Sequence, residues 1–147
     1  MTARDYIAMA RQYADDVVSG RVVAGKLEIA ACRRQLEDLA RETSDEWPWV
    51  FVPELAVRPC EFIELLPHIK GKWARERRRI GLEGWQCFIL TCVFGWVHHE
   101  TGLRRFTEVY EEVARKNAKS TKCAGIALYM LAADGEEGAE VYTAASM

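Results

Sequence analysis

The chain has 147 residues, half of them hydrophobic and 29% charged, which is the composition of an ordinary globular domain with its own core. Its 20 basic and 22 acidic residues give a net charge of −2, so a nucleic acid or membrane partner would require a local patch. Five widely spaced cysteines without a CxxC pair argue against a zinc site or a disulfide framework, and buried free thiols suit a reducing cytoplasm. The longest apolar run, 87–97, is too short to span a membrane.

Helical periodicity dominates the first half of the chain. It predicts helices over 3–19 and 24–42, which a short link would join into an antiparallel hairpin. The aromatic stretch 47–53 is bounded by prolines, so extended chain is expected there. A third helix is predicted over 58–69, with Pro59 in its first turn and four apolar side chains facing inward: Phe62, Ile63, Leu66 and Ile69.

Residues 70–84 are polar and basic, and the run from Arg75 to Arg79 holds four arginines. These side chains are suited to phosphate contacts, and a solvated charge run is the alternative. A helix with a wide apolar face, and therefore a buried one, is predicted over 84–96.

The periodicity changes after residue 105. Residues 106–114 are rich in β-formers and predict a strand, although Glu111 and Glu112 interrupt the alternation. A loop, a helix over 119–133, an Asp134-Gly135 turn and a strand over 139–145 follow. The last 40 or so residues therefore predict one βαβ unit behind a mainly helical region.

The junction between this strand and helix carries the strongest chemical signal. A P-loop wraps backbone N–H groups around phosphate at a helix N-terminus, and adds a lysine for the β/γ-phosphates and a hydroxyl for Mg²⁺. Aligned with GxxxxGK[ST], the chain supplies Lys119 and Ser120 but holds Val113 and Ala118 at the glycine positions. A solvated, basic helix start is the alternative.

Several separated blocks resemble the large terminase subunit of tailed bacteriophages, a DNA-packaging motor. They occur in the family's order: 61–66, 70–73, 82–89, 106–121, 124–135 and 138–145. The Walker A variant of that family commonly reads Arg-Lys-Asn-Gly/Ala-Lys-Ser/Thr, so Ala118 conforms to it. The resemblance covers nearly the whole chain from about residue 5.

The resemblance implies a role for each loop residue. Lys119 would bind the β/γ-phosphates and Ser120 would hold Mg²⁺ with the nucleotide, while Arg115 or Lys116 would stabilise the γ-phosphate. The whole nucleotide-binding set is Arg115, Lys116, Asn117, Ala118, Lys119, Ser120 and Thr121. Trp85 and Gln86 resemble the adenine-recognising glutamine motif, although Gly84 stands where the family has proline. The alternative is a core Trp85 and a surface Gln86.

The fold implied is α/β, the N-terminal portion of a RecA-like P-loop NTPase. Residues 1–105 would form a mainly helical region with the adenine-motif-like segment, and 106–147 would begin the ATPase core. The implied function is ATP- and Mg²⁺-dependent translocation of double-stranded DNA, with cleavage of concatemeric DNA by the parent protein. A homo-oligomeric ring, the portal and the small terminase subunit are implied partners, in the cytoplasm of the infected or lysogenic bacterial host.

The 147 residues contain no apolar strand ending in Asp-Glu, the Walker B feature that activates water, and no acidic nuclease set. We therefore expect a truncated or split product, without ATP hydrolysis or DNA cleavage of its own. Two alternatives stay open. One is a prophage-derived interaction module that binds terminase, capsid-portal or host proteins; the other is an unrelated helical protein.

Overall fold

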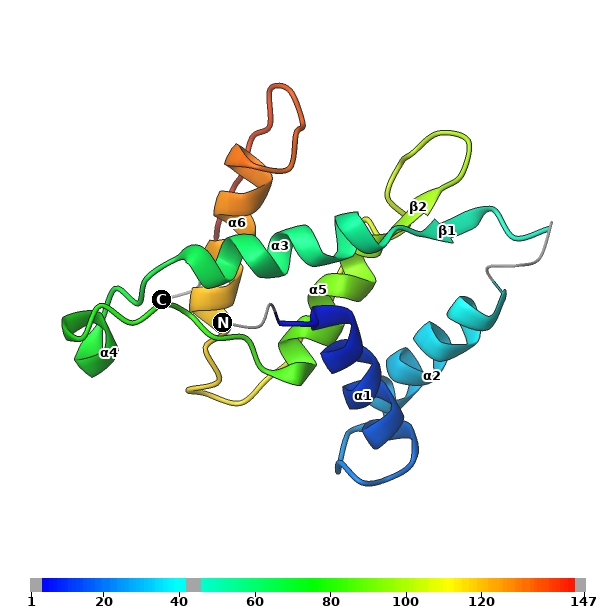
Figure 1. Ribbon diagram of the computed structural model, residues 1–147, viewed down its shortest axis with the longest axis horizontal. Coiled ribbons are helices and arrows are strands. Elements are labelled where there is room, and N and C mark those ends of the chain that lie inside the picture. Colours follow the sequence, from blue (N-terminus) through cyan, green and yellow to red (C-terminus); the bar gives the residue numbers. More distant parts are fainter. Residues whose placement is uncertain (1–3, 42–45, 145–147) are drawn as a thin grey trace. The chain divides into compact units, whose positions relative to one another are not determined.

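The computed structural model describes residues 4–41 and 46–144 (Figure 1). The chain forms two compact units, one of Met1–Cys60 with Gly81–Val109 and the other of Glu61–Ile80 with Tyr110–Met147. The predicted division after residue 105 stays a prediction. No helix in the described parts of the chain is long and apolar enough to cross a membrane.

The first unit is built on three helices, as the periodicity predicted. Helix α1 (Tyr6–Val18) packs against α2 (Lys26–Arg41) and against α5 (Gly84–Gly95). The Asp5 side chain caps α1 by accepting a hydrogen bond from the Ala8 N–H at 2.9 Å. Tyr13 of α1 donates to Glu28 of α2, and burial, followed by this bond, raises the pKa of the Tyr13 hydroxyl.

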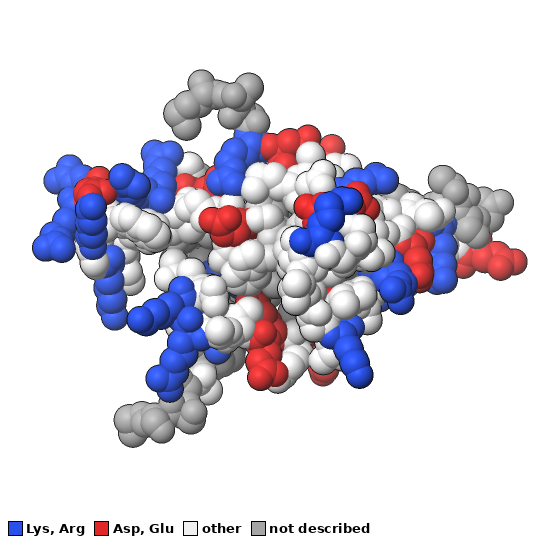
Figure 2. Space-filling view, turned by 90° about the horizontal axis from the view of Figure 1, so that it is seen from below, with Lys and Arg blue, Asp and Glu red and all other residues white. Residues whose placement is uncertain are grey.

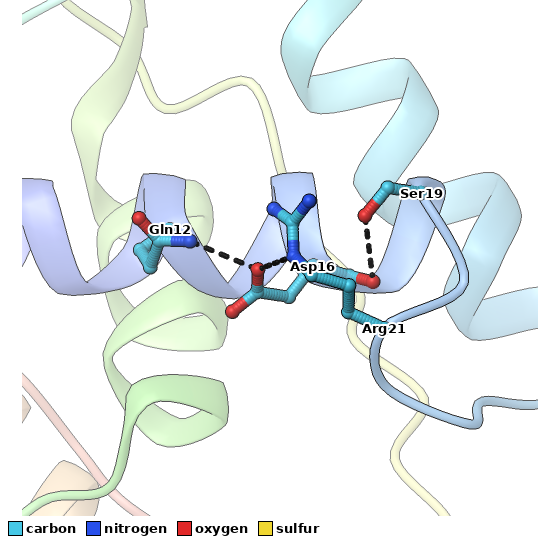
Figure 3. A network of polar contacts seen from close by, with 4 residues as sticks. All are labelled: Gln12, Asp16, Ser19 and Arg21. Atoms are coloured by element: carbon cyan, nitrogen blue, oxygen red, sulfur yellow. Dashed lines mark hydrogen bonds and ion pairs between the residues drawn. The ribbon is translucent and has the colours of Figure 1, made fainter.

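A polar network closes the C-terminal end of α1 (Figure 3). The Asp16 carboxylate accepts hydrogen bonds from Gln12 at 2.9 Å and from Arg21 at 2.6 Å. Ser19 donates to the Asp16 carbonyl at 3.2 Å. The bond from Arg21 holds the pKa of Asp16 below its ordinary value. The network fixes the turn that leads the chain toward α2.

The expected extended segment after residue 47 forms strand β1 (Trp49–Phe51), which pairs with an unpredicted strand, β2 (Trp96–His98). The pair is antiparallel, and Val50 lies opposite Val97. A Cβ added to Gly95 would lie 2.5 Å from the Phe51 ring, so only glycine allows this approach between α5 and β1.

Helix α3 (Pro53–Leu65) corrects the prediction of a helix over 58–69. It begins at Pro53, a residue whose fixed φ suits a first turn, and Pro59 lies inside it. It ends before Pro67, because the residue preceding a proline avoids helical backbone. Ile63 is buried as expected, but Ile69 lies beyond the helix and is 83% exposed.

A buried ion pair lies among the aromatic residues of the first unit. The Arg105 guanidinium donates to the Asp38 carboxylate at 2.6 Å, and the Asp38 side chain is only 3% exposed. The guanidinium also lies 5.0 to 5.9 Å from the ring centroids of four aromatic residues: Trp47, Trp49, Trp96 and Phe106. Such contacts stabilise a cation whose water has been removed.

Four of the five cysteines are buried thiols, and Cys123 is exposed. Burial raises the pKa of Cys32 to about 12 and that of Cys92 to about 11, so both stay protonated at neutral pH. Cys92 and the Trp96 indole both donate to the Gln35 side-chain oxygen, at 3.1 and 2.8 Å. These thiols therefore contribute to the core of the first unit.

The second unit contains the end of α3, the short helix α4 (Gly71–Arg75) and helix α6 (Lys119–Ala132). The helix predicted over 119–133 is confirmed. The prediction of a βαβ unit is wrong for its two strands. No strand forms over 106–114, and none forms over 139–144, the described part of 139–145. A strand is completed by hydrogen bonds to a neighbour, and these two segments pair with no strand in the described chain. The observed sheet is the pair β1 and β2.

Replacing Asp38 by alanine is expected to destabilise the first unit by about 3–5 kcal/mol, because Arg105 would keep a largely buried charge without its partner. Urea unfolding followed by tryptophan fluorescence measures the change. Glu37→Ala, at the exposed neighbouring position, is the matched control and should change stability by less than about 0.5 kcal/mol. Equal losses in the two variants would contradict the prediction.

Candidate functional site

The loop before α6 has the backbone of a tight, left-handed turn. Lys116 has φ of +70° and Ala118 has φ of +55°, a region that residues with a side chain seldom adopt. Asn117 donates from its side chain to the Ala114 carbonyl at 3.1 Å, which closes the turn on itself. Ala118 thus takes the backbone conformation that glycine ordinarily supplies.

The loop leads directly into the N-terminus of α6. Ala118 is the N-cap residue, and no side chain caps the helix. The first α-helical bond runs from the Lys122 N–H to the Ala118 carbonyl at 2.9 Å. Lys119 and Ser120 are exposed at this end. Open N–H groups, the positive end of the helix dipole and a lysine together suit an anion.

An ion pair connects the two sides of the loop. The Lys122 side chain is 1% exposed, and its ammonium group donates to the carboxylate of Glu111, which is 18% exposed. The other carboxylate oxygen of Glu111 is buried and has no hydrogen-bond partner in the described chain. Since charges are rarely buried without a partner, this pair fixes the segment before the loop against the first turn after it.

Helix α6 is positioned by close packing on α3. A Cβ added to Gly125 would lie 2.9 Å from Ile63 Cγ1, so the glycine lets the two helices approach. One turn later the Tyr129 ring contacts Phe62 edge-on at 5.7 Å between centroids. Lys122, Gly125 and Tyr129 share the buried face of α6, which leaves the loop at its exposed end.

Trp85 and Gln86 lie in the first unit, at the start of α5. Gln86 is buried and forms a capping box with Glu83: its side-chain oxygen accepts from the Glu83 N–H at 2.9 Å, and the Glu83 side chain accepts from the Gln86 N–H. Trp85 is half-buried. Gln86 therefore has a local structural role, and its amide N–H₂ remains the group suited to a base edge.

No group of three or more His, Cys, Asp or Glu side chains arranged to hold a metal ion occurs in the described residues. A Mg²⁺ ion bound by a nucleotide needs no such group, because phosphate oxygens, water and one hydroxyl supply its ligands. The exposed Ser120 in the first turn of α6 provides a hydroxyl of this kind.

Both the loop and the α5 segment fall within one family match. Residues 84–147 match the family described as terminase large subunit, ATPase domain. The match covers less than half of the chain and supports a terminase large-subunit fragment there. The match confirms the resemblance seen in the sequence, and the terminase-like blocks before residue 84 stay a prediction. No curated protein and no solved structure matches the chain.

The structure adds two residues that the sequence did not assign to the site, Lys122 and Glu111. The sequence held a signal for each of them. Glu111 interrupts the alternation of β-formers in 106–114, and Lys122 has the helical spacing of the buried Gly125 and Tyr129. Two opposite charges at apolar positions on either side of a loop indicate a buried pair.

Breaking this pair is expected to destabilise the second unit. Lys122→Met and Glu111→Gln should each cost about 3 kcal/mol, because each removes one partner of a buried ion pair. The double variant should lose clearly less than the sum of the two, since the two effects are coupled. Urea unfolding of all three variants measures the coupling. Additive losses would show that the two side chains are not coupled. Lys116→Met, at an exposed position, is the control.

Proposed function

We propose that this chain is the ATP-binding part of a terminase large-subunit motor, with residues 115–121 as its phosphate loop. The observation that carries the proposal is Ala118, which adopts the left-handed backbone of the missing glycine directly before an uncapped helix N-terminus. Lys119 would bind the β/γ-phosphates, and Ser120 would bind the Mg²⁺ that accompanies them. Arg115 or Lys116 would stabilise the charge on the γ-phosphate.

The proposal extends to the fold around the loop. The proposed fold is the N-terminal portion of a RecA-like P-loop NTPase, to which the loop and α6 would contribute. Trp85 and Gln86 would contact the adenine ring, with Gln86 acting through its amide N–H₂. ATP-driven DNA translocation, cleavage of concatemers and the ring-shaped assembly belong to the proposed parent function, together with the portal and small-subunit partners.

Lys119→Ala is the direct test of nucleotide binding. The chain should bind a fluorescent ATP analogue in the presence of Mg²⁺, and the variant should bind at least about tenfold more weakly, because a charge-assisted phosphate contact is lost. Lys26→Ala removes an exposed charge at the start of α2 and is the matched control. Equal binding by the Lys119 variant and the control would refute the assignment.

Position 118 tests the backbone argument separately from the lysine. Ala118→Gly should bind the analogue as well as the parent chain or better, since glycine adopts positive φ without cost. Ala118→Val should weaken binding about tenfold or more, because a β-branched residue is strongly disfavoured at positive φ. The same titration measures both variants, and circular dichroism checks that α6 persists. Unchanged binding by Ala118→Val would show that nucleotide binding does not depend on the positive φ of residue 118.

A second candidate is an interaction module without catalysis. Helix α6 exposes apolar side chains, with Leu128 at 47% and Leu131 at 54%, and Tyr142 beyond it is 84% exposed. Exposed apolar groups that lie close together favour association with a protein. Light scattering after size exclusion distinguishes the two candidates, since stable oligomers that bind no nucleotide would favour the module.

A further inference from the structure

Helix α6 presents an apolar stripe to solvent. Ala124, Leu128 and Leu131 follow one another at spacings of four and three residues, so their side chains share one face of the helix. All three are exposed, Leu128 at 47% and Leu131 at 54%. The face that packs on α3 is a different one, which contains Gly125 and Tyr129. We refer to the three exposed residues as the α6 stripe.

The exposed surface around this stripe is uncharged. Between Ser120 and Ala132 the one charged residue is Lys122, and its side chain is 1% exposed. A surface helix of a globular protein ordinarily carries charged side chains on the face that is turned away from the core. An apolar face of the opposite kind is typical of a surface that another protein covers.

The charges near α6 gather at its two ends. Arg115, Lys116 and Lys119 lie at its N-terminal end, Glu136 and Glu137 follow its C-terminal end, and all five are exposed. The dipole of the helix opposes both groups, because its N-terminus is positive and its C-terminus is negative. A second helix that lies antiparallel to α6 reverses this, since it brings its negative end beside the cations and its positive end beside the anions.

We propose that α6 pairs antiparallel with α6 of a second copy of this chain, about a two-fold axis near Leu128. In this register Ala124 lies opposite the partner's Leu131, so that a small side chain faces a large one. Lys119 lies five residues before Ala124, and Glu136 lies five residues after Leu131. The same register therefore directs Lys119 toward the partner's acidic turn, and each contact occurs twice, as a two-fold interface requires.

The pair is a closed dimer and not a step in a ring or filament, because a two-fold interface uses the same surface on both copies. The 14 residues of α6 extend over about 20 Å, which separates the cations at one end from the anions at the other. The proposal rests on the apolar stripe and on these end charges, and it does not depend on nucleotide binding by the loop.

Analytical ultracentrifugation of the chain over a dilution series tests the proposal. We expect a reversible equilibrium whose upper limit is twice the chain's mass of 16.8 kDa. The double variant Leu128→Glu, Leu131→Glu should associate at least about tenfold more weakly, because the interface would bury charges without partners. Leu27→Glu with Leu103→Glu, at exposed leucines of the first unit, is the matched control and should stay within about twofold of the parent chain.

A parent chain that stays monomeric would overturn the proposal in favour of a different partner for the stripe. Equal losses in the two double variants would overturn it as well, and so would growth beyond the dimer mass. Circular dichroism of each variant checks that the helices persist.

The end charges test the antiparallel direction separately. Lys119→Glu should weaken the dimer about threefold or more, since two contacts between opposite charges become repulsive, and the added change Glu136→Lys should restore it. Figure 2 shows another group of basic side chains over α4, and Arg75→Glu at the end of that helix makes the same change of charge as a control. If Glu136→Lys fails to restore association, the proposed register is wrong.

Discussion

The Asp38 carboxylate is the constraint on which the first unit depends. A carboxylate that is almost fully buried on α2 requires a cation, and Arg105 supplies it from the segment after β2. The guanidinium then brings Trp47, Trp49 and Trp96 around itself, so one charge orders residues from β1, from β2 and from the chain before them. The short strands alone would not achieve this, because a two-stranded ribbon is marginally stable in water.

The second unit repeats this arrangement on a smaller scale. Lys122 is buried on the same face of α6 as Gly125 and Tyr129, and its ammonium group pairs with the Glu111 carboxylate. The pair holds the chain before the phosphate loop at a fixed place relative to the helix after it. Both units thus use a buried ion pair to fix a segment that lacks regular structure. Buried pairs seldom increase net stability, but they do select one arrangement of the chain over others.

The sequence predicted best what depends on local periodicity. Helices α1, α2, α5 and α6 were found because their buried residues recur at helical spacing. The start of α3 was missed because Pro59 resembled a first-turn proline, whereas Pro53 holds that position. Strand β2 was missed because its partner, β1, lies some fifty residues earlier, and pairing at that distance leaves no local signal. The strands expected at 106–114 and 139–145 had the right residue types, but strand formation also requires a hydrogen-bonded neighbour.

The candidate site shows a related limit of pattern matching. The loop residues were located by the terminase resemblance, whereas the glycine pattern alone argued against them. Glycine is required in such a loop only for its backbone conformation, and Ala118 adopts that conformation at a cost of about 1–2 kcal/mol. A cost of that size is tolerable where neighbouring contacts hold the chain, as Asn117 and the Lys122–Glu111 pair do here. The loop therefore depends on its anchors more than a glycine loop would, and mutations at Glu111 or Lys122 should disturb it although neither residue is part of the motif.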